Sequence, residues 1–327
     1  MQTLTDYQKL DTDLIMKGVY DWLFKQTNGL LQTMPVREVK GNGVKYNVET
    51  AYPGGAWTRP GDVIPEDTGT YTQRSAAIYE LIGDADVDKF SIATNATQNP
   101  ELIEIKRKTR GMMNEWYDQL IYGQTTTSSS TNQPKGLLLL CAEIESESTT
   151  DLDAPNNSQV VANHATSAAL TIAKIEELVD ACKSGATNLM MSRWSRRKLN
   201  ALARAAGNNL EHDKDQLGYF VTRFGEQTLL INDYIEDNFP DSSSSITTIS
   251  TAVKHVTRAN TTDNSPIFAM RLAEDGLCII QAGGFKHENI GTVQNKDAIR
   301  HRFKWYTGFA CYDKFSLSVL TGVNPET

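Results

Sequence analysis

The sequence has no apolar run long enough to cross a bilayer. The longest, Leu137 to Ala142, spans six residues, whereas a membrane-spanning helix needs ~20. The first residues, Met1 to Asp6, contain neither the basic nor the apolar part of a secretory signal. We therefore expect a protein that is neither secreted nor inserted in a membrane.

Cysteine is scarce and scattered. Cys141, Cys182, Cys278 and Cys311 form no C-x-x-C pair, and in a chain of this length they do not indicate a disulfide framework. We expect four buried thiols in a reducing compartment.

Motifs that carry catalysis or bind nucleotides are also missing. Gly41-Asn42-Gly43 lacks the third glycine of a dinucleotide loop and runs into a strand. Neither a G-x-x-x-x-G-K phosphate loop nor a G-x-S-x-G nucleophile elbow occurs. The histidines lie too far apart in sequence for two to ligate a metal from adjacent turns of one helix. We expect no enzyme activity, no cofactor and no metal.

One segment has a metal-like spacing. Asp84, Asp86 and Asp88 match the first ligands of a calcium loop, but Lys89 replaces its glycine and Asn95 its bidentate glutamate. We interpret this segment as a solvated turn.

The chain is acidic and somewhat short of apolar residues. Its 327 residues carry a net charge of −8, which argues against a dedicated nucleic-acid binder. Apolar residues, with Gly counted and Tyr omitted, make up about 42%, against about 45–50% in globular chains. Polar tracts at 124–133 and 145–158 and a Pro- and Gly-rich loop at 51–70 account for much of this shortage.

A long hairpin is predicted in the first third of the chain. Apolar and polar residues alternate in Val44–Glu49, as in a half-buried strand, and Tyr71–Leu81 is the expected return strand. The loop between them carries Trp57 and Arg59, residue types that are enriched at interface hot spots. We interpret the hairpin as an arm. The alternative is a surface loop whose Trp57 packs against its own domain.

The strongest helix signal spans Pro100–Tyr122. Asn99 is the expected N-cap, and proline suits the first helical position. Positive charge is concentrated at 106–110, which indicates either an acidic partner or, as the preferred interpretation, a solvated face paired with Glu104 and Glu115.

The remainder of the chain predicts an α/β unit, and a further helix is expected within residues 1–34. Asp275-Gly276 is interpreted as a hairpin turn. The expected helices are 172–182 and 193–206, and the expected strands are 188–191, 219–224, 227–231, 267–271, 277–281, 298–309 and 314–321.

The order of these parts resembles the major capsid protein of tailed bacteriophages, the Hong Kong 97-type shell fold. Three phrases are similar to that family: Leu30–Val39 followed by Gly41-Asn42-Gly43, then Tyr122-Gly123 with Pro134–Leu138, and Met191-Ser192-Arg193 opening a helix. The similarity covers nearly the whole chain.

The resemblance implies an α+β fold in four parts. These are an N-terminal arm (1–35), an extended β-hairpin loop (36–90), a peripheral domain (91–160 and 290–327, with its spine helix at 100–122) and an axial domain (161–289). It places subunit contacts on the extended loop and the spine helix, at Tyr52, Trp57, Arg59, Arg107 and Arg110.

The resemblance also implies a function. Hexamers and pentamers would self-assemble in the host bacterial cytoplasm into an icosahedral head, the virion capsid, enclosing double-stranded DNA without sequence specificity. A separate scaffolding protein, a portal and a decoration protein are the expected partners.

Two alternatives stay open. An encapsulin-type compartment shares the fold but holds cargo enzymes. An α/β enzyme would need a site assembled from distant residues, with His301, Asp313 and Glu288 as its candidates.

Overall fold

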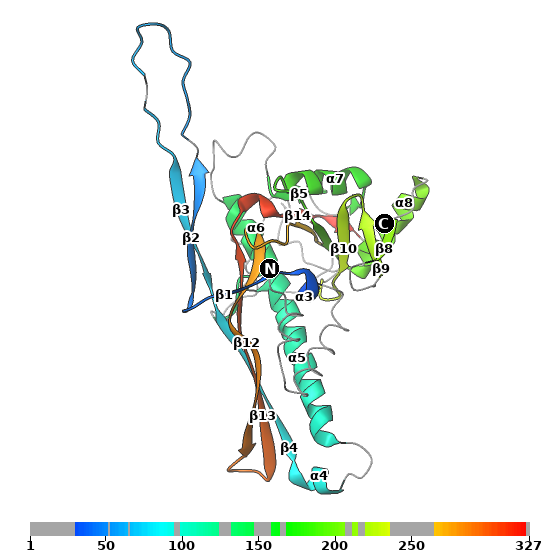
Figure 1. Cartoon of the computed structure of the whole chain (residues 1–327). Coiled ribbons are helices and arrows are strands. Elements are labelled where there is room, and N and C mark those ends of the chain that lie inside the picture. The colour runs from blue at the N-terminus through cyan, green and yellow to red at the C-terminus, as the bar shows by residue number, and fades with distance from the viewer. Residues whose placement is uncertain are drawn as a thin grey trace.

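The structure is a computed structural model that describes most of the chain: residues 30–51, 53–64, 66–94, 99–123, 132–146, 158–163, 168–206, 211–214, 220–235 and 265–324. The helix expected before residue 30 lies outside these residues, as do most of the two polar tracts. The described chain combines a long sheet with one long helix, a second sheet flanked by helices, and a projecting hairpin (Figure 1).

The long sheet has four strands in the order β1-β12-β13-β4. β12 and β13 form an antiparallel hairpin, β4 runs antiparallel to β13, and β1 lies parallel to β12. Because β4 pairs on one side only, it is an edge strand. The strands are β1 (Val36–Glu38), β4 (Tyr79–Asp88), β12 (Leu277–Thr292) and β13 (Ala298–Cys311).

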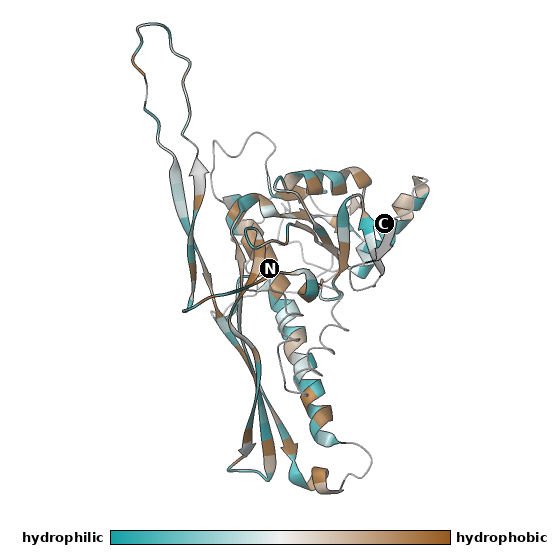
Figure 2. Ribbon diagram, viewed as in Figure 1, coloured by the Kyte–Doolittle hydropathy of each residue, from teal (hydrophilic) through white to brown (hydrophobic). Residues whose placement is uncertain are grey.

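One long helix, α5 (Pro100–Tyr122), packs against β4 and has the predicted bounds. The side chain of Asn99 accepts a hydrogen bond from the backbone N–H of Glu101 (3.0 Å) and so caps the start. Polar and apolar residues alternate along the helix (Figure 2); apolar residues such as Ile105 and Trp116 are buried, whereas Leu102 and Ile103 in the first turn are exposed. A short helix, α4 (Lys89–Thr94), links β4 to it.

A seven-stranded sheet, named here the head sheet, has the order β5-β14-β11-β7-β10-β9-β8. Thr171 and Ser192 cap the two helices beside it. The elements are β5 (Val160–Ala162), α7 (Ile172–Ala181), β7 (Asn188–Met191), α8 (Arg193–Ala205), β8 (Glu211–Lys214), β9 (Phe220–Phe224), β10 (Gln227–Ile231), β11 (Ile267–Met270) and β14 (Leu317–Thr321).

A continuous core joins the two sheets. The apolar run becomes helix α6 (Leu137–Ser146), which packs against both α5 and β14. Trp116 of α5 stacks on Trp305 of β13 with ring centroids 5.4 Å apart. Phe268 and Val319 of the head sheet belong to the same buried cluster. The remaining short elements are α3 (Leu30–Thr33), β6 (Ala168–Ala169), β15 (Val323–Asn324) and the 3₁₀ turn Lys314–Ser316.

Two predictions around β12 are wrong. Asp275-Gly276 does form a turn, but it connects the head sheet to the long sheet instead of closing a hairpin. The strand predicted to end at Gln281 continues to Thr292. Gly283 and Gly284 adopt positive φ (82° and 70°) and produce a bulge, so that glycines typical of a turn lie inside the strand.

Strand pairing crosses the expected domain boundaries. Residues 79–88, placed in the extended loop, pair with β13 of the expected peripheral domain. β14, from that domain, lies between two strands of the head sheet. β12 runs across the boundary at 289. The four-part division of the chain stays a prediction.

Candidate functional site

The projecting hairpin consists of β2 (Gly43–Ala51), β3 (Thr70–Ala77) and the residues between them, and is named here the arm. Its strands pair from Gly43 and Ala77 outward to Ala51 and Thr70. The hydroxyl of Tyr46 donates to the carbonyl of Cys311 (2.8 Å) and fixes the base of the arm to the long sheet. Beyond that base the arm extends away from the body (Figure 1).

The tip of the arm exposes apolar side chains. Trp57, Val63 and Ile64 have relative exposures of 105%, 91% and 80%. A small turn orders the tip, because the backbone N–H of Arg59 donates to the Asp62 carboxylate (3.0 Å). The alternative in which Trp57 packs against its own domain is wrong. Tyr52 lies outside the described residues.

The basic run on α5 does not form a single patch. Arg107 is exposed and pairs with Glu104 (2.8 Å), as the solvated-face interpretation predicts. Arg110 is exposed and lies near Tyr234. Glu115, the other predicted partner, accepts from Gln119 (2.9 Å). In Figure 1 the tip of the arm and α5 point to opposite ends of the molecule, so one chain does not bring the predicted contact residues together.

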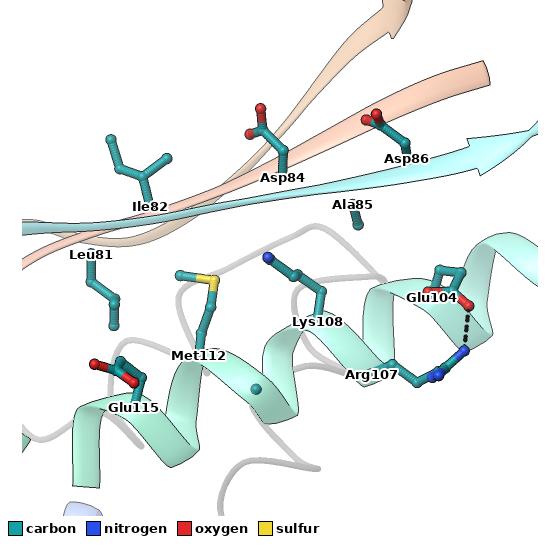
Figure 3. Close-up of a pocket in the computed structure, with 11 residues that line it drawn as sticks. Leu81, Ile82, Asp84, Ala85, Asp86, Glu104, Arg107, Lys108, Met112 and Glu115 are labelled. Carbon is teal, nitrogen blue, oxygen red and sulfur yellow. Dashed lines mark hydrogen bonds and ion pairs between the residues drawn. The ribbon is translucent and has the colours of Figure 1, made fainter. Parts of the chain in front are cut away.

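A groove of about 530 Å³ separates α5 from β4. The side chain of Lys108 points from the helix toward the strand (Figure 3), and in the described part of the chain no carboxylate pairs with it. Gly83 makes room, since a Cβ there would lie 2.5 Å from Cε of Lys108. The groove thus places the ammonium of Lys108 beside the apolar side chains of Leu81 and Met112.

The aspartates with calcium-like spacing lie in β4, not in a turn, and that interpretation is wrong. Asp84 accepts two hydrogen bonds from Arg302 (2.7 and 2.8 Å), and Asp86 accepts two from Arg300 (2.6 and 2.7 Å). Arg300 also lies 3.6 Å from Asp84. These four side chains are named here the ion-pair ladder. They face away from α5, as the two aspartates in Figure 3 show.

The ladder lowers the pKa of both of its aspartates. Hydrogen bonds from Arg302 hold the pKa of Asp84 below its usual value, and hydrogen bonds from Arg300 do the same for Asp86. Alternate residues of these strands, such as Ala85 and Phe303, face α5 and are buried. The ladder therefore ties the outer face of the sheet together while the inner face packs on the helix.

The three residues suggested for an enzyme do not converge. His301 is 1% exposed and contacts His287 (2.9 Å) and Glu101 (2.8 Å). Glu288 pairs with Lys304 (2.6 Å) across the strands. Asp313 caps the 3₁₀ turn and accepts from Ser184. The enzyme site proposed from sequence is not formed by these residues.

The predicted burial of the cysteines is confirmed. All four are free and buried. Burial raises the pKa of Cys182 and Cys278 to about 12 and that of Cys311 to about 11, so these thiols are protonated and poor nucleophiles at neutral pH.

Among the described residues, no cluster of three or more His, Cys, Asp or Glu side chains is placed to hold a metal ion. No helix in that part of the chain is both long and apolar enough to span a membrane.

Solved structures match this fold over most of its length. An encapsulin complex from Synechococcus elongatus matches with a TM-score of 0.60 at 14% identity, covering 92% of this chain and 89% of the other. The capsid of a native gene transfer agent matches with a TM-score of 0.60 at 13% identity, covering 90% of both chains. The protein has the Hong Kong 97-type capsid fold.

A further structure with this fold, from Mycobacterium phage Adephagia, matches with a TM-score of 0.58 at 12% identity, covering 90% of both chains. No protein-family model matches the sequence, and no curated protein matches it significantly. The fold predicted from the order of parts is confirmed, at identities too low for sequence comparison to detect.

Sequence reasoning missed two features. The ion-pair ladder left only a weak signal, the alternating Asp84-x-Asp86 and Arg300-x-Arg302 in segments 214 residues apart. The second is a cluster of basic residues on α8, whose signal in the sequence is the run Arg193-Trp194-Ser195-Arg196-Arg197-Lys198.

Proposed function

We propose that many copies of this chain assemble into a closed icosahedral shell, as hexamers and pentamers, and that the shell is a bacteriophage head enclosing double-stranded DNA. The observation that carries this proposal is the arm, which leaves the body with Trp57, Val63 and Ile64 exposed at its tip. Apolar side chains so exposed are typical of a surface that binds another protein.

The partner we assign to the tip is the α5 face of a neighbouring copy. Residues 53–69 contain three acidic residues and one basic residue, whereas 106–110 of α5 contain four basic residues and no acidic one. The groove beside α5 adds apolar surface from Leu81 and Met112. A tip that binds a different surface from its own makes a head-to-tail contact, which closes into rings when the rotation allows.

This assignment keeps Trp57 and Arg59 on the arm, and Arg107 and Arg110 on α5, as contact residues between subunits. Tyr52 stays a proposed contact as well. Scaffolding, portal and decoration proteins remain proposed partners, and the virion capsid, assembled in the host cytoplasm, the proposed location.

The test is assembly of the purified chain, followed by electron microscopy and sedimentation. The wild type should form shells or capsomers, and Trp57→Ala with Arg59→Ala should leave soluble, folded subunits. Lys286→Ala, an exposed change on β12 away from the arm and α5, is the matched control and should assemble normally. A wild type that remains monomeric at high concentration would refute the proposal.

The encapsulin-type compartment is the second candidate, because an encapsulin matches the fold as well as the phage and gene transfer agent capsids do. Particles purified from producing cells separate the two functions. A phage head protects double-stranded DNA from nuclease, whereas a compartment contains a co-purifying enzyme and no protected DNA.

A further inference from the structure

Helix α8 differs in charge from the rest of this acidic chain. Its 13 residues include four arginines, one lysine and no acidic residue, although the whole chain has a net charge of −8. Such a concentration of Arg and Lys along one helix is the electrostatic feature expected of a polyanion site.

The fold orients these side chains. Ser192 caps the helix, and its hydroxyl accepts a hydrogen bond from the backbone N–H of Ser195 (3.2 Å). Ser195, Leu199 and Ala203 are buried and fix the rotation of the helix about its axis. The opposite face is therefore held toward solvent.

Three arginines occupy that opposite face. Arg193, Arg197 and Arg204 are exposed and, at about 3.6 residues per turn, lie within about 40° of one another around the axis. At about 1.5 Å per residue they extend over roughly 16 Å. These three residues are named here the basic stripe.

Most of this charge is not neutralised within the described structure. Asp233 accepts hydrogen bonds from Arg193, one of them 2.8 Å long. The guanidinium of Arg197 lies 5.8 Å from the ring of Trp194, and Arg204 donates to the carbonyl of Asn200 (3.2 Å). Among the described residues no carboxylate pairs with Arg197 or Arg204, so their charges are available to a ligand.

The composition of this surface favours nucleic acid over protein. Protein interfaces have an apolar core, but none of the large apolar side chains exposed in the described residues lies on α8; they lie on the arm, at Ile82, Phe90 and Ile290, and at the start of α5. Interfaces with nucleic acid are more polar and positively charged, and a guanidinium binds phosphate through two parallel hydrogen bonds. In Figure 1, α8 and the arm leave the body on opposite sides, so both surfaces can be used together.

We infer that the basic stripe binds the phosphate backbone of double-stranded DNA without sequence specificity. This inference deepens the proposed shell function, on which it rests, by naming the surface through which the wall contacts its content. A few guanidinium contacts on each subunit give weak binding, which repetition over many copies makes substantial.

The test uses the purified full-length chain and a fluorescent DNA duplex of about 30 base pairs, with affinity measured by anisotropy between about 50 and 200 mM salt. Arg197→Gln with Arg204→Gln should weaken binding about tenfold at the lower salt concentration. Because each lost phosphate contact removes about 0.9 from the slope of log affinity against log salt, the slope should fall by about 1.8.

The matched control removes the same charge elsewhere. Lys286→Gln with Lys296→Gln changes two exposed lysines, one on β12 and one in the turn between β12 and β13, and should leave affinity within about twofold. Equal weakening by both double variants would overturn the inference, because net charge alone would then explain binding. Absence of binding by the wild type, or equal competition by polyglutamate, which would indicate an acidic protein partner, would also overturn it.

Electron microscopy of the same samples separates this inference from the proposed function. Shells that form normally but do not bind DNA would contradict DNA binding by the basic stripe and leave the proposed shell function standing. Chains that bind DNA through the basic stripe but never assemble would contradict the proposed shell function. Circular dichroism of each variant verifies that the exposed substitutions leave the fold intact.

Discussion

The arm and the outer part of the long sheet are both long antiparallel ribbons, and they differ in what covers their faces. In the long sheet, Phe303 and Trp305 are buried against α5 on one face, and the ion-pair ladder ties the strands on the other. In the arm, β3 is exposed over most of its length, and Tyr46 anchors only the base. A two-stranded hairpin without a packed face is marginally stable by itself. Among the described residues the arm therefore lacks a packed face, which the proposed neighbour would supply, whereas the long sheet has one against α5.

The largest loss of stability should come from a substitution on the packed face of the long sheet. Trp305 is 1% exposed and stacks on Trp116, so Trp305→Ala should lower the free energy of unfolding by about 3–5 kcal/mol. Urea unfolding of the unassembled chain, monitored by circular dichroism, measures this loss. A loss below about 1 kcal/mol would show that the sheet does not depend on α5.

A smaller loss is expected where the arm joins the long sheet. A Cβ on Gly308 would lie 2.3 Å from the carbonyl oxygen of Ala77, a backbone atom, so Gly308→Ala should cost about 1–3 kcal/mol. Gly83→Ala is the control. Its Cβ would meet the flexible side chains of Lys108 and Met112, which can move aside. Equal losses in urea unfolding would contradict a rigid joint between the two ribbons.

The ladder should contribute an acid-dependent part of the stability of the long sheet. Arg302 and Arg300 lower the pKa of Asp84 and Asp86, so this contribution is fully present above the unfolded value of about 3.9 and is lost as pH falls through the lower folded values. Asp84→Asn with Asp86→Asn should remove it. Between about pH 2 and 7, the free energy of unfolding of this variant should decrease less steeply below pH ~4 than that of the wild type. If the two curves were parallel, the ladder would not contribute to stability.

The smallest effect on the isolated subunit should come from the arm. Trp57 contacts none of the core, so Trp57→Ala should change the unfolding free energy of unassembled chain by no more than about 0.5 kcal/mol. The same tryptophan-to-alanine change thus distinguishes the two ribbons, because it should lower the free energy of unfolding at Trp305 and leave it nearly unchanged at Trp57. A substantial loss at Trp57 would mean that the arm is stabilised from within its own chain.

Local signals predicted the helices and several strands well. Asn99 and Pro100 determine where α5 begins, and Ser192 determines where α8 begins, because capping depends on residues within one turn. Strand ends were less predictable. Gly283 and Gly284 are typical of turns, and only pairing with the long β13 keeps them inside β12 as a bulge.

The candidate site was predicted in part. Exposure of Trp57 and Arg59 on an arm follows from a Pro- and Gly-rich loop that packs against no other part of the described chain. The preferred interpretation of 106–110 as a uniform solvated face was too simple, because a helix distributes adjacent residues around its axis and only Arg107 pairs with Glu104. The basic stripe needed the buried face of α8 to be known before its exposed face could be defined.

The sequence by itself determined the order of parts, the bounds of α5, the alternating apolar and polar residues of the arm's first strand and the burial of the cysteines. Each of these depends on neighbouring residues or on composition. Tertiary structure alone decided the partners of Asp84 and Asp86, the different contacts made by His301, Glu288 and Asp313, and the direction in which the arginines of α8 point. These outcomes depend on contacts between segments as many as 218 residues apart, and no local pattern specifies which distant strand will form such contacts.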